Sequence, residues 1–271
     1  MKDFKDKVVV ITGSATGIGF SFAKAFGAEG AKVVLSGRRD DRLQDAANSL
    51  SDLDVDVRYH RCDVAQKREV EALADFAWDA FGRVDVIVNN AGIILPQHPA
   101  IDTPDDDVQR IFAVNFYGVW HGSAVFGKRF VEQGTPAAIY NVGSENSFFS
   151  AAPFAAPYVA TKHAVLALTD ALREETPDFI DIGLICPGLV RSEIASQEVM
   201  ALGMDTDRFT AVAMEQMKKG AFFIVSHAYN IARIDARHDE VAEAYAQHAP
   251  RYEGDDEFDV RTLSAKLGEH S

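Results

Sequence analysis

The sequence has little of several features that mark particular classes of protein. Its 271 residues include only two cysteines, Cys62 and Cys186, which excludes a disulfide framework and favours a reducing compartment. No apolar run approaches the roughly 20 residues that a membrane-spanning helix needs. The first residues lack the pattern of a signal peptide, and the eight histidines lack the spacing of metal ligands. We therefore expect a soluble, cytoplasmic protein with no metal.

Basic residues are also scarce relative to acidic ones. Lysine and arginine together number 27 against 41 aspartates and glutamates, and the net charge is −14. Such a charge repels phosphate backbones and anionic lipid surfaces. Nucleic acid and membranes are therefore poor candidates as partners, and a small-molecule substrate is the better expectation.

The sequence does contain an alternation of short apolar runs with longer amphipathic stretches. Hydrophobic residues make up 47% of the chain, enough for one large core. Runs that are apolar on both faces are typical of strands in a buried parallel sheet, with the amphipathic stretches as helical crossovers. The pattern predicts a single doubly wound, Rossmann-like α/β domain over 1–271, with ligands at the carboxyl ends of the strands. The expected strands are 8–11, 32–35, 55–60, 84–88, 137–142 and 180–185, and a further apolar run is 221–225.

A glycine-rich turn follows the first predicted strand, where residues 12–19 read TGSATGIG. Its three glycines permit a tight turn and a close approach of backbone to a pyrophosphate. The helix that follows would direct its N–H groups and positive dipole end at that anion. Glycines can serve turn geometry alone, but the strand–turn–helix context favours a dinucleotide. Cofactor contacts are expected from Gly13, Ser14, Thr16, Gly17, Ile18 and Gly19.

The spacing TGxxxGxG resembles that of the short-chain dehydrogenase/reductase family, and the resemblance extends over about residues 6–192. Three further loops support it: NNAG at 89–92, CDV at 62–64, and PGLVRS at 187–192, where Ser192 replaces the usual threonine. The resemblance implies that Asp63 reaches the adenine amino group and that the Val190 backbone and Ser192 hydroxyl hold the nicotinamide carboxamide. Each loop alone could be an ordinary turn. The implied cofactor contacts are Asp63, Val64, Asn90, Ala91, Gly92, Pro187, Gly188, Val190 and Ser192, together with Tyr158 and Lys162.

The end of the second predicted strand indicates which cofactor is bound. A NAD enzyme of this architecture places an acidic residue there to accept from the ribose 2′-hydroxyl. Gly37 stands at that position and is followed by Arg38 and Arg39, whose guanidinium groups suit a phosphate. The pair could instead be solvated and opposed to neighbouring aspartates. We expect NADP(H) to be favoured over NAD(H).

Tyr158 and Lys162 form a YxxxK pair in a helical stretch, so they share a helix face. A nearby ammonium would lower the pKa of the tyrosine from its ordinary value near 10 and make it a better acid–base catalyst. An exposed Tyr–Lys pair has the same spacing. The resemblance adds Ser144, as the serine that binds the substrate oxygen, and Asn115, as the asparagine that anchors a water on the proton path of the lysine. Ser147 lies too close to Tyr158 to replace Ser144.

After Ser192 the sequence departs from the family. The usual C-terminal tail gives way to AFFIVSH at 221–227 and a predicted helix at 233–248, so a homo-oligomer, dimer or tetramer, is expected without a fixed order. Residues 193–219 are expected to form a substrate lid and 250–271 a polar tail. Apolar residues predict a pocket for a bulky ketone or secondary alcohol, although they could be core. They are Ile93, Ile94, Leu95, Phe148, Phe149, Phe154, Met200, Leu202, Met204 and Phe209.

These observations predict an NADP(H)-dependent oxidoreductase that interconverts a ketone and a secondary alcohol, with Tyr158 as general acid and base. Two alternatives remain open. A protein that only senses the cofactor would need the phosphate turn but not the four catalytic positions. An epimerase or dehydratase of the same fold usually carries a longer C-terminal substrate domain than the residues after Ser192 provide. The role of Glu145, beside Ser144, is also open.

Overall fold

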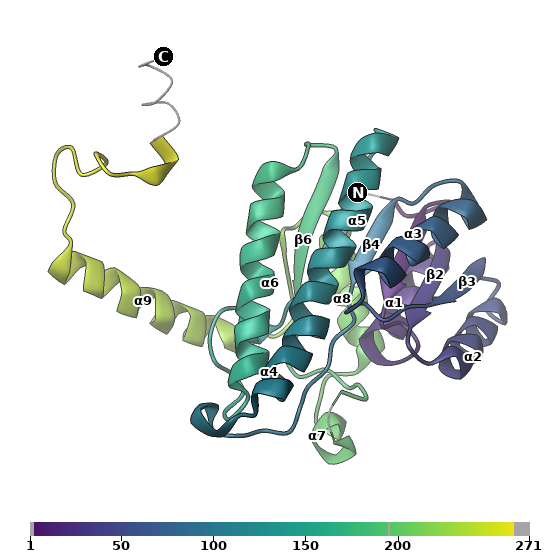
Figure 1. Ribbon diagram of the computed structural model, residues 1–271, viewed down its shortest axis with the longest axis horizontal. Coiled ribbons are helices and arrows are strands. Elements are labelled where there is room, and N and C mark those ends of the chain that lie inside the picture. Colours follow the sequence, from purple (N-terminus) through teal and green to yellow (C-terminus); the bar gives the residue numbers. More distant parts are fainter. Residues whose placement is uncertain (1–2, 195, 263–271) are drawn as a thin grey trace. The chain divides into compact units, whose positions relative to one another are not determined.

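The computed structural model describes residues 3–194 and 196–262, and its contacts divide the chain into two compact units, 1–228 and 229–271. The first unit is built on a seven-stranded sheet in which every pair of neighbouring strands is parallel, in the order β3-β2-β1-β4-β5-β6-β7 (Figure 1). The doubly wound, Rossmann-like α/β fold is thereby confirmed. The strands are β1 (Val8–Thr12), β2 (Lys32–Gly37), β3 (Val57–Arg61), β4 (Val86–Asn89), β5 (Ala137–Val142), β6 (Ile180–Cys186) and β7 (Phe223–Val225).

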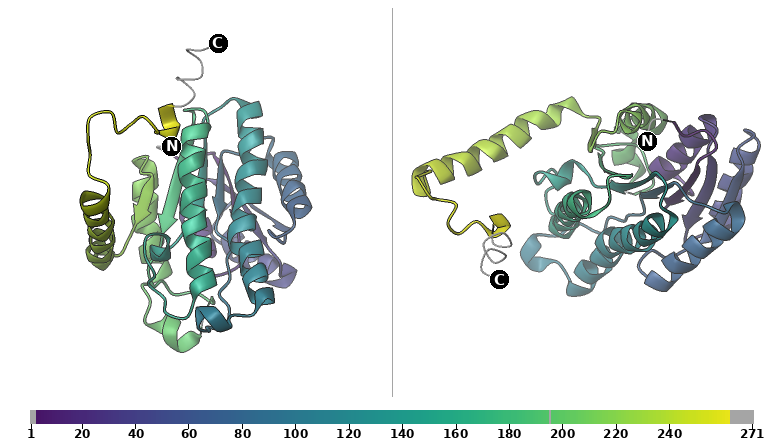
Figure 2. Two further views of the ribbon diagram at one scale, coloured as in Figure 1. Left: turned by 60° about the vertical axis from the view of Figure 1, so that its left-hand side comes forward. Right: turned by 90° about the horizontal axis from the view of Figure 1, so that it is seen from above.

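Helices cover both faces of this sheet (Figure 2). One face packs against α1, α2 and α8 through a core that includes Phe22, Phe26, Leu50 and Phe209, and the other packs against α3, α5 and α6. Because both faces are covered, β1 and β5 are buried along their whole length, as the apolar runs predict. The helices are α1 (Gly17–Ala28), α2 (Asp40–Ser51), α3 (Lys67–Phe81), α4 (Asp105–Phe112), α5 (Gly118–Gln133), α6 (Ala156–Glu175), α7 (Gln197–Ala201), α8 (Thr206–Lys218) and α9 (Ile231–His248).

The order of the strands determines where a ligand can bind. From β1 the chain winds to β2 and β3 on one side, and then returns to β4 and the remaining strands on the other. At this switch point the chain leaves β1 and β4 toward helices on opposite faces of the sheet, and a crevice opens at the carboxyl ends of the strands. The same edge receives the loops that follow β2, β5 and β6.

The helical run between β4 and β5 is interrupted. A π-helical segment at Ala113–Tyr117 separates α4 from α5 and contains Asn115. A π-helical turn inserts one extra residue into a helix, and such turns are frequent at functional sites. Short 3-10 turns lie at Ala100–Asp102, Glu145–Ser147, Ala228–Asn230 and Val260–Thr262.

The second unit consists of α9 and the segment after it. The 18 residues of α9 include none that is buried. Residues 250–262 of the expected polar tail are mainly exposed, and residues 263–271 lie outside the described residues. Over 3–194 and 196–262, each helix is too short or too polar to cross a bilayer.

Candidate active site

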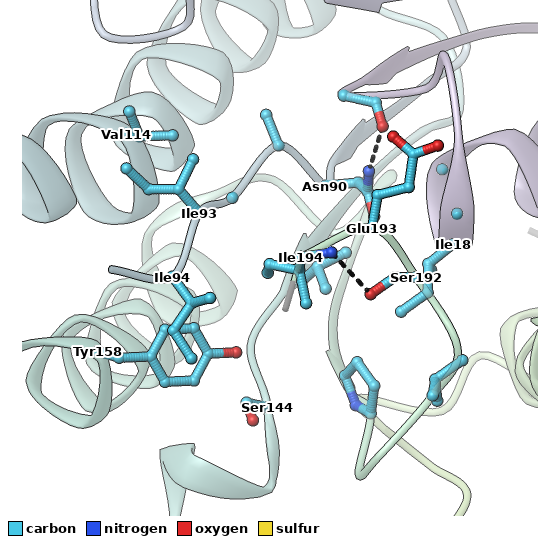
Figure 3. Close-up of a pocket in the computed structure, with 18 of the residues that line it drawn as sticks. Ile18, Asn90, Ile93, Ile94, Val114, Ser144, Tyr158, Ser192, Glu193 and Ile194 are labelled. Carbon is cyan, nitrogen blue, oxygen red and sulfur yellow. Dashed lines mark hydrogen bonds between the residues drawn. The ribbon is translucent and has the colours of Figure 1, made fainter. Parts of the chain in front are cut away.

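A cavity of about 1010 Å³ opens at the carboxyl edge of the sheet. The loops after β1, β2, β3, β4, β5 and β6 all contribute to its lining, together with the segment before α7. In Figure 3, Tyr158 and Ile94 lie on one side of this space, Ser192 and Ile18 lie on the other, and the hydroxyl of Tyr158 points between them. The volume is at the upper end of the range for small-molecule sites, as a dinucleotide together with a substrate requires.

The glycine-rich turn after β1 is packed against the NNAG loop after β4. The side chain of Asn90 donates from Nδ2 to the carbonyls of Thr12 (2.8 Å) and Gly13 (3.0 Å). Gly13 has φ +64°, and a Cβ on it would lie 2.7 Å from the Cα of Ala91. A Cβ on Gly19 would lie 2.5 Å from the Gly13 carbonyl oxygen. These positions therefore require glycine, and the turn holds its backbone close to the cavity.

The residues of this turn fit a dinucleotide pyrophosphate. Thr16 is the N-cap of α1, and its side chain makes no capping hydrogen bond to the described residues, so the first-turn N–H groups remain for another acceptor. Thr16, Gly17, Ile18 and Gly19 line the cavity, as do Gly13, Asn90, Ala91 and Gly92. Ser14 differs from the prediction. Its hydroxyl is fully buried, donates to the Ile11 carbonyl (2.8 Å) and accepts from the Ser36 N–H (2.9 Å), which joins β1 to β2.

The residues predicted to bind the adenosine end of the cofactor also line the cavity. Gly37, Arg38 and Arg39 after β2 line it, together with Asp63 and Val64 after β3. The Arg39 guanidinium forms an ion pair with the Glu193 carboxylate at 3.3 Å, and both side chains are 54% exposed. The arginine at this end of the cavity thus already contacts an anion, supplied by the segment after β6.

The loop after β5 holds Ser144 against α6. The Oγ of Ser144 accepts from the Asn146 N–H (3.1 Å) and from Asn146 Nδ2 (3.3 Å). The Ser144 N–H donates to Ser147 Oγ (3.2 Å), which in turn donates to the carbonyl of Lys162 (2.9 Å). Ser144, Tyr158 and Lys162 all line the cavity, so these three catalytic candidates are brought together.

The ionisation of Tyr158 and Lys162 differs from the prediction. Burial raises the pKa of Tyr158 above its ordinary value, while the Ser144 hydroxyl acts in the opposite direction. Burial also lowers the pKa of Lys162 to about 8. The ammonium donates to the Val142 carbonyl (2.8 Å) and lies 5.6 Å from the centre of the Tyr158 ring. The expected lowering of the Tyr158 pKa by Lys162 is therefore absent: burial and, to a smaller extent, the negative charge of Glu145 raise this pKa, and only the Ser144 hydroxyl lowers it.

Asn115 is fully buried and acts on the loop after NNAG. Its Nδ2 donates to the Ile93 carbonyl (2.9 Å), and its Oδ1 accepts from the Ile93 N–H (2.8 Å). Both polar atoms of the amide thus hold Ile93, which lines the cavity together with Ile94. Asn115 lies within the π-helical segment, and through these two bonds it holds the wall of the cavity in place.

The turn after β6, predicted to hold the nicotinamide, contributes Pro187, Gly188, Val190 and Ser192 to the cavity lining. The Pro187 carbonyl accepts from the Glu145 N–H (2.9 Å), which ties this turn to the loop of Ser144. Ser192 Oγ accepts from the Ile194 N–H (3.4 Å; Figure 3). The loop that carries Ser144 and the turn after β6 are therefore directly joined by the hydrogen bond between Glu145 and Pro187.

The apolar residues predicted to form the pocket divide into two groups. Ile93, Ile94, Leu95 and Met200 line the cavity, and Phe154 lines a small adjoining pocket. In contrast, Phe209 packs against Phe22 in the core, Phe148 packs against Phe223, and Leu202 is 82% exposed. Within the expected lid, residues before α8 line the cavity, whereas α8 buries its apolar face against α1.

Three residues that the sequence did not single out take part in the site. Asn146 orients Ser144 and also accepts from the Ala151 N–H (2.9 Å) through its Oδ1. Glu193 pairs with Arg39, and His227 accepts a hydrogen bond from Gly188 (3.2 Å). The position of Asn146, two residues after Ser144, could have indicated its role from the sequence. The contacts of Glu193 and His227 could be recognised only in the folded structure.

Comparison with known proteins agrees with this architecture. The family profile described as short chain dehydrogenase matches residues 7–202. The chain is 32% identical to the oxidoreductase YxnA of Bacillus subtilis, over 70% of this chain and 54% of that protein. It is 34% identical to 1-deoxy-11-beta-hydroxypentalenate dehydrogenase of Streptomyces avermitilis, over 67% of each, and 32% identical to C alpha-dehydrogenase of Sphingobium sp., over 72% of this chain and 64% of that protein.

Solved structures show the same likeness. A short-chain dehydrogenase/reductase from Burkholderia phymatum in complex with NAD has a TM-score of 0.86 at 28% identity, covering 93% of this chain and 99% of that one. An alcohol dehydrogenase from Thermococcus sibiricus, complexed with 5-hydroxy-NADP, has a TM-score of 0.71 at 28% identity, covering 78% and 90%.

The chain belongs to the short-chain dehydrogenase family. Its neighbours include proteins solved with NAD and with an NADP derivative. The match spans about half the length of the B. subtilis relative and 35% of the mycobacterial oxidoreductase EphD.

Proposed function

We propose that the protein is an NADP(H)-dependent oxidoreductase that interconverts a ketone and a secondary alcohol, with Tyr158 as the general acid and base. The observation that carries this proposal is the convergence of Ser144, Tyr158 and Lys162 on one cavity whose far end is lined by Arg38 and Arg39. A protein that only senses the cofactor would need the arginine-lined end of the cavity but not the convergence of Ser144, Tyr158 and Lys162.

In the direction of reduction, the bound nicotinamide would supply a hydride to the carbonyl carbon. Ser144 already accepts two hydrogen bonds from Asn146 at its Oγ, which leaves its own proton to donate to an oxygen in the cavity. Tyr158, whose pKa is raised, keeps its proton at neutral pH and is suited to donate it to the same oxygen. Both side chains thus serve the carbonyl oxygen, one by binding it and one by protonating it.

Lys162 would replace the proton that Tyr158 gives up. A pKa of about 8 places its ammonium close to the balance between charged and neutral forms at the pH of the cell, where a group can both release and regain a proton. Lys162 and the backbone around Val190, with Ser192, would also hold the ribose and carboxamide of the cofactor. Asn115 supports the wall on which the substrate rests and, following the resemblance, would anchor a water on the proton path.

The preference for NADP(H) is proposed from the residues after β2. The position of an acidic residue is occupied by Gly37, so the 2′-phosphate would meet no negative charge there, and Arg38 and Arg39 line the cavity beside it. A guanidinium binds a phosphate with charge-assisted hydrogen bonds. The neighbours solved with NAD and with an NADP derivative are compatible with either cofactor.

The substrate is proposed to be bulky and apolar. Ile93, Ile94, Leu95 and Met200 give the cavity an apolar wall near Tyr158, whereas Glu145 would disfavour an anionic substrate. A site with few polar groups suits aryl or alicyclic ketones better than sugars or hydroxy acids. Residues 193–201 are proposed as the part of the lid that closes over this substrate. A cytoplasmic location and a homo-oligomer, dimer or tetramer, remain proposals.

The experiment is a panel of ketones and secondary alcohols with NADPH, NADH and their oxidised forms, followed at the absorbance band of the reduced nicotinamide. The proposal expects net oxidation of NADPH by at least one ketone. Product formation without net change of the cofactor would indicate an epimerase instead. Tight binding of the cofactor without turnover of any compound would favour the sensor.

A further inference from the structure

Strands β6 and β7 leave the sheet side by side, and the residues that follow them remain paired. The last rung of the parallel ladder joins Cys186 to Val225. Two residues further on, β6 reaches Gly188 in the expected nicotinamide turn, and β7 reaches His227. The connection at that point is made by a side chain, because the Gly188 N–H donates to His227 Nδ1 at 3.2 Å.

This contact defines the state of the imidazole. A backbone N–H can only donate, so Nδ1 of His227 must be the acceptor and the ring proton lies on Nε2. The hydroxyl of Ser226 also lies 2.7 Å from the same Nδ1 and can donate to it. His227 is therefore the acceptor for the amide of a glycine that itself lines the cavity.

The turn is fixed on its other side by the catalytic loop. The Pro187 carbonyl accepts from the Glu145 N–H at 2.9 Å, one residue after Ser144. The dipeptide Pro187-Gly188 thus lies between the loop that carries Ser144 and the imidazole of His227. Glycine has wide conformational freedom, so the amide of Gly188 needs an acceptor if the residues that follow are to keep one position.

We propose that His227 is a positioning residue, which fixes the turn after β6 through Gly188 and so places the nicotinamide end of the cofactor. The inference rests on the proposed function, because it takes Val190 and Ser192 as the residues that hold the carboxamide. The adenosine end is bound by different loops, those after β2 and β3. Loss of the imidazole acceptor should therefore weaken binding of the nicotinamide half and leave the adenosine half unchanged.

Three variants separate this role from a general effect on folding. His227→Leu removes the acceptor with an apolar side chain of moderate size, and His227→Asn restores an acceptor oxygen near the position of Nδ1. His238→Leu, at an exposed position of α9 and outside the cavity lining, is the matched control for loss of a histidine. His227→Ala replaces the leucine variant if circular dichroism shows that the latter is unfolded.

The experiment measures dissociation constants for two pairs of ligands, each made of a cofactor and the fragment of it that lacks the nicotinamide. The first pair is NADPH and 2′-phospho-ADP-ribose, and the second is NADH and ADP-ribose. For the cofactor that the wild type prefers, His227→Leu should weaken binding about tenfold, because an amide donor is left without its partner. Binding of the matching fragment should stay within about twofold, and His227→Asn should recover most of the loss. Fluorescence of the bound reduced nicotinamide should change in the leucine variant and be recovered in the asparagine variant.

Equal losses for cofactor and fragment, no loss for either, or an asparagine variant as weak as the leucine variant would overturn the positioning role. In those cases a wild type that oxidises NADPH with a ketone leaves the proposed function standing. A wild type that binds none of the four probes would overturn the proposed function and this inference together.

Discussion

Replacing Lys162 by methionine should make the protein more stable while it impairs catalysis. The lysine is 4% exposed, and burial lowers its pKa from 10.5 to about 8. At about 1.4 kcal/mol for each pKa unit, holding the charged form inside the fold costs about 3 kcal/mol below pH 8. Methionine removes this cost but also loses the hydrogen bond to the Val142 carbonyl, a contribution of about 1 kcal/mol. We expect a net gain of about 2 kcal/mol in the free energy of unfolding at pH 7.

The difference in the free energy of unfolding between wild type and Lys162→Met should depend on pH. Because the folded-state pKa is lowered, the unfolded chain binds the proton of Lys162 more readily between pH 8 and pH 10.5. The wild type therefore gains stability as the pH rises through this window, so the difference between the two proteins should close within it and reverse to about 1 kcal/mol in favour of the wild type at its upper end, where only the lost hydrogen bond remains.

The assay is urea unfolding of the cofactor-free protein at pH 7 and at the highest pH that the fold tolerates, at one protein concentration. Lys128→Met, on the solvent-exposed side of α5, is the control, because the Lys128 side chain is 79% exposed and its loss should change the stability little. A Lys162→Met protein that is less stable than the wild type at pH 7, or a difference that does not depend on pH, would refute the argument from burial.

Three further predictions concern the ends of the cavity. Arg38→Ala should weaken NADPH roughly ten- to a hundredfold and NADH much less, because a charge-assisted hydrogen bond to the 2′-phosphate is lost; equal losses in a titration of the two cofactors would reject this assignment. Glu193→Gln should tighten NADPH up to about fivefold with little effect on NADH, because it removes the carboxylate that competes for Arg39 in an exposed ion pair; an unchanged Kd for NADPH would show that the pair does not compete. The kcat/KM should rise along a series from acetone-sized to two-ring ketones and fall for a carboxylate-bearing analogue, whereas a flat series would contradict an apolar pocket.

Much of the fold could be predicted because its signals are local. The apolar runs of β1 and β5 are buried along their whole length, and the TGxxxGxG turn lies between β1 and α1 as expected. The convergence of Ser144, Tyr158 and Lys162 could also be predicted from the sequence, because Ser144 comes shortly after β5 and the other two residues share one face of α6.

Other features depend on packing that no local pattern shows. The π-helical segment around Asn115 lies in a sequence whose helical periodicity continues on either side. Phe209 lies in the segment that the sequence predicts to be a lid, yet in the structure it is buried between α8 and α1, against Phe22. The contact of His227 with Gly188 depends on the register of β7 beside β6.

The pKa of Tyr158 could not be predicted from the YxxxK spacing either. The spacing gives the proximity of Lys162 but not the degree of burial, and burial decides the direction of the shift.

The central claim, that Tyr158 donates the proton while a nicotinamide supplies the hydride, is tested most directly by Tyr158→Phe. With the ketone that reacts best, the steady-state rate of NADPH oxidation and the Kd of NADPH by fluorescence are measured on the same preparations of wild type and variant. The account predicts a kcat lower by about 10²–10⁴-fold, the usual contribution of a general acid, with a Kd within about threefold of the wild type. A variant that retains turnover within about tenfold of the wild type would contradict it.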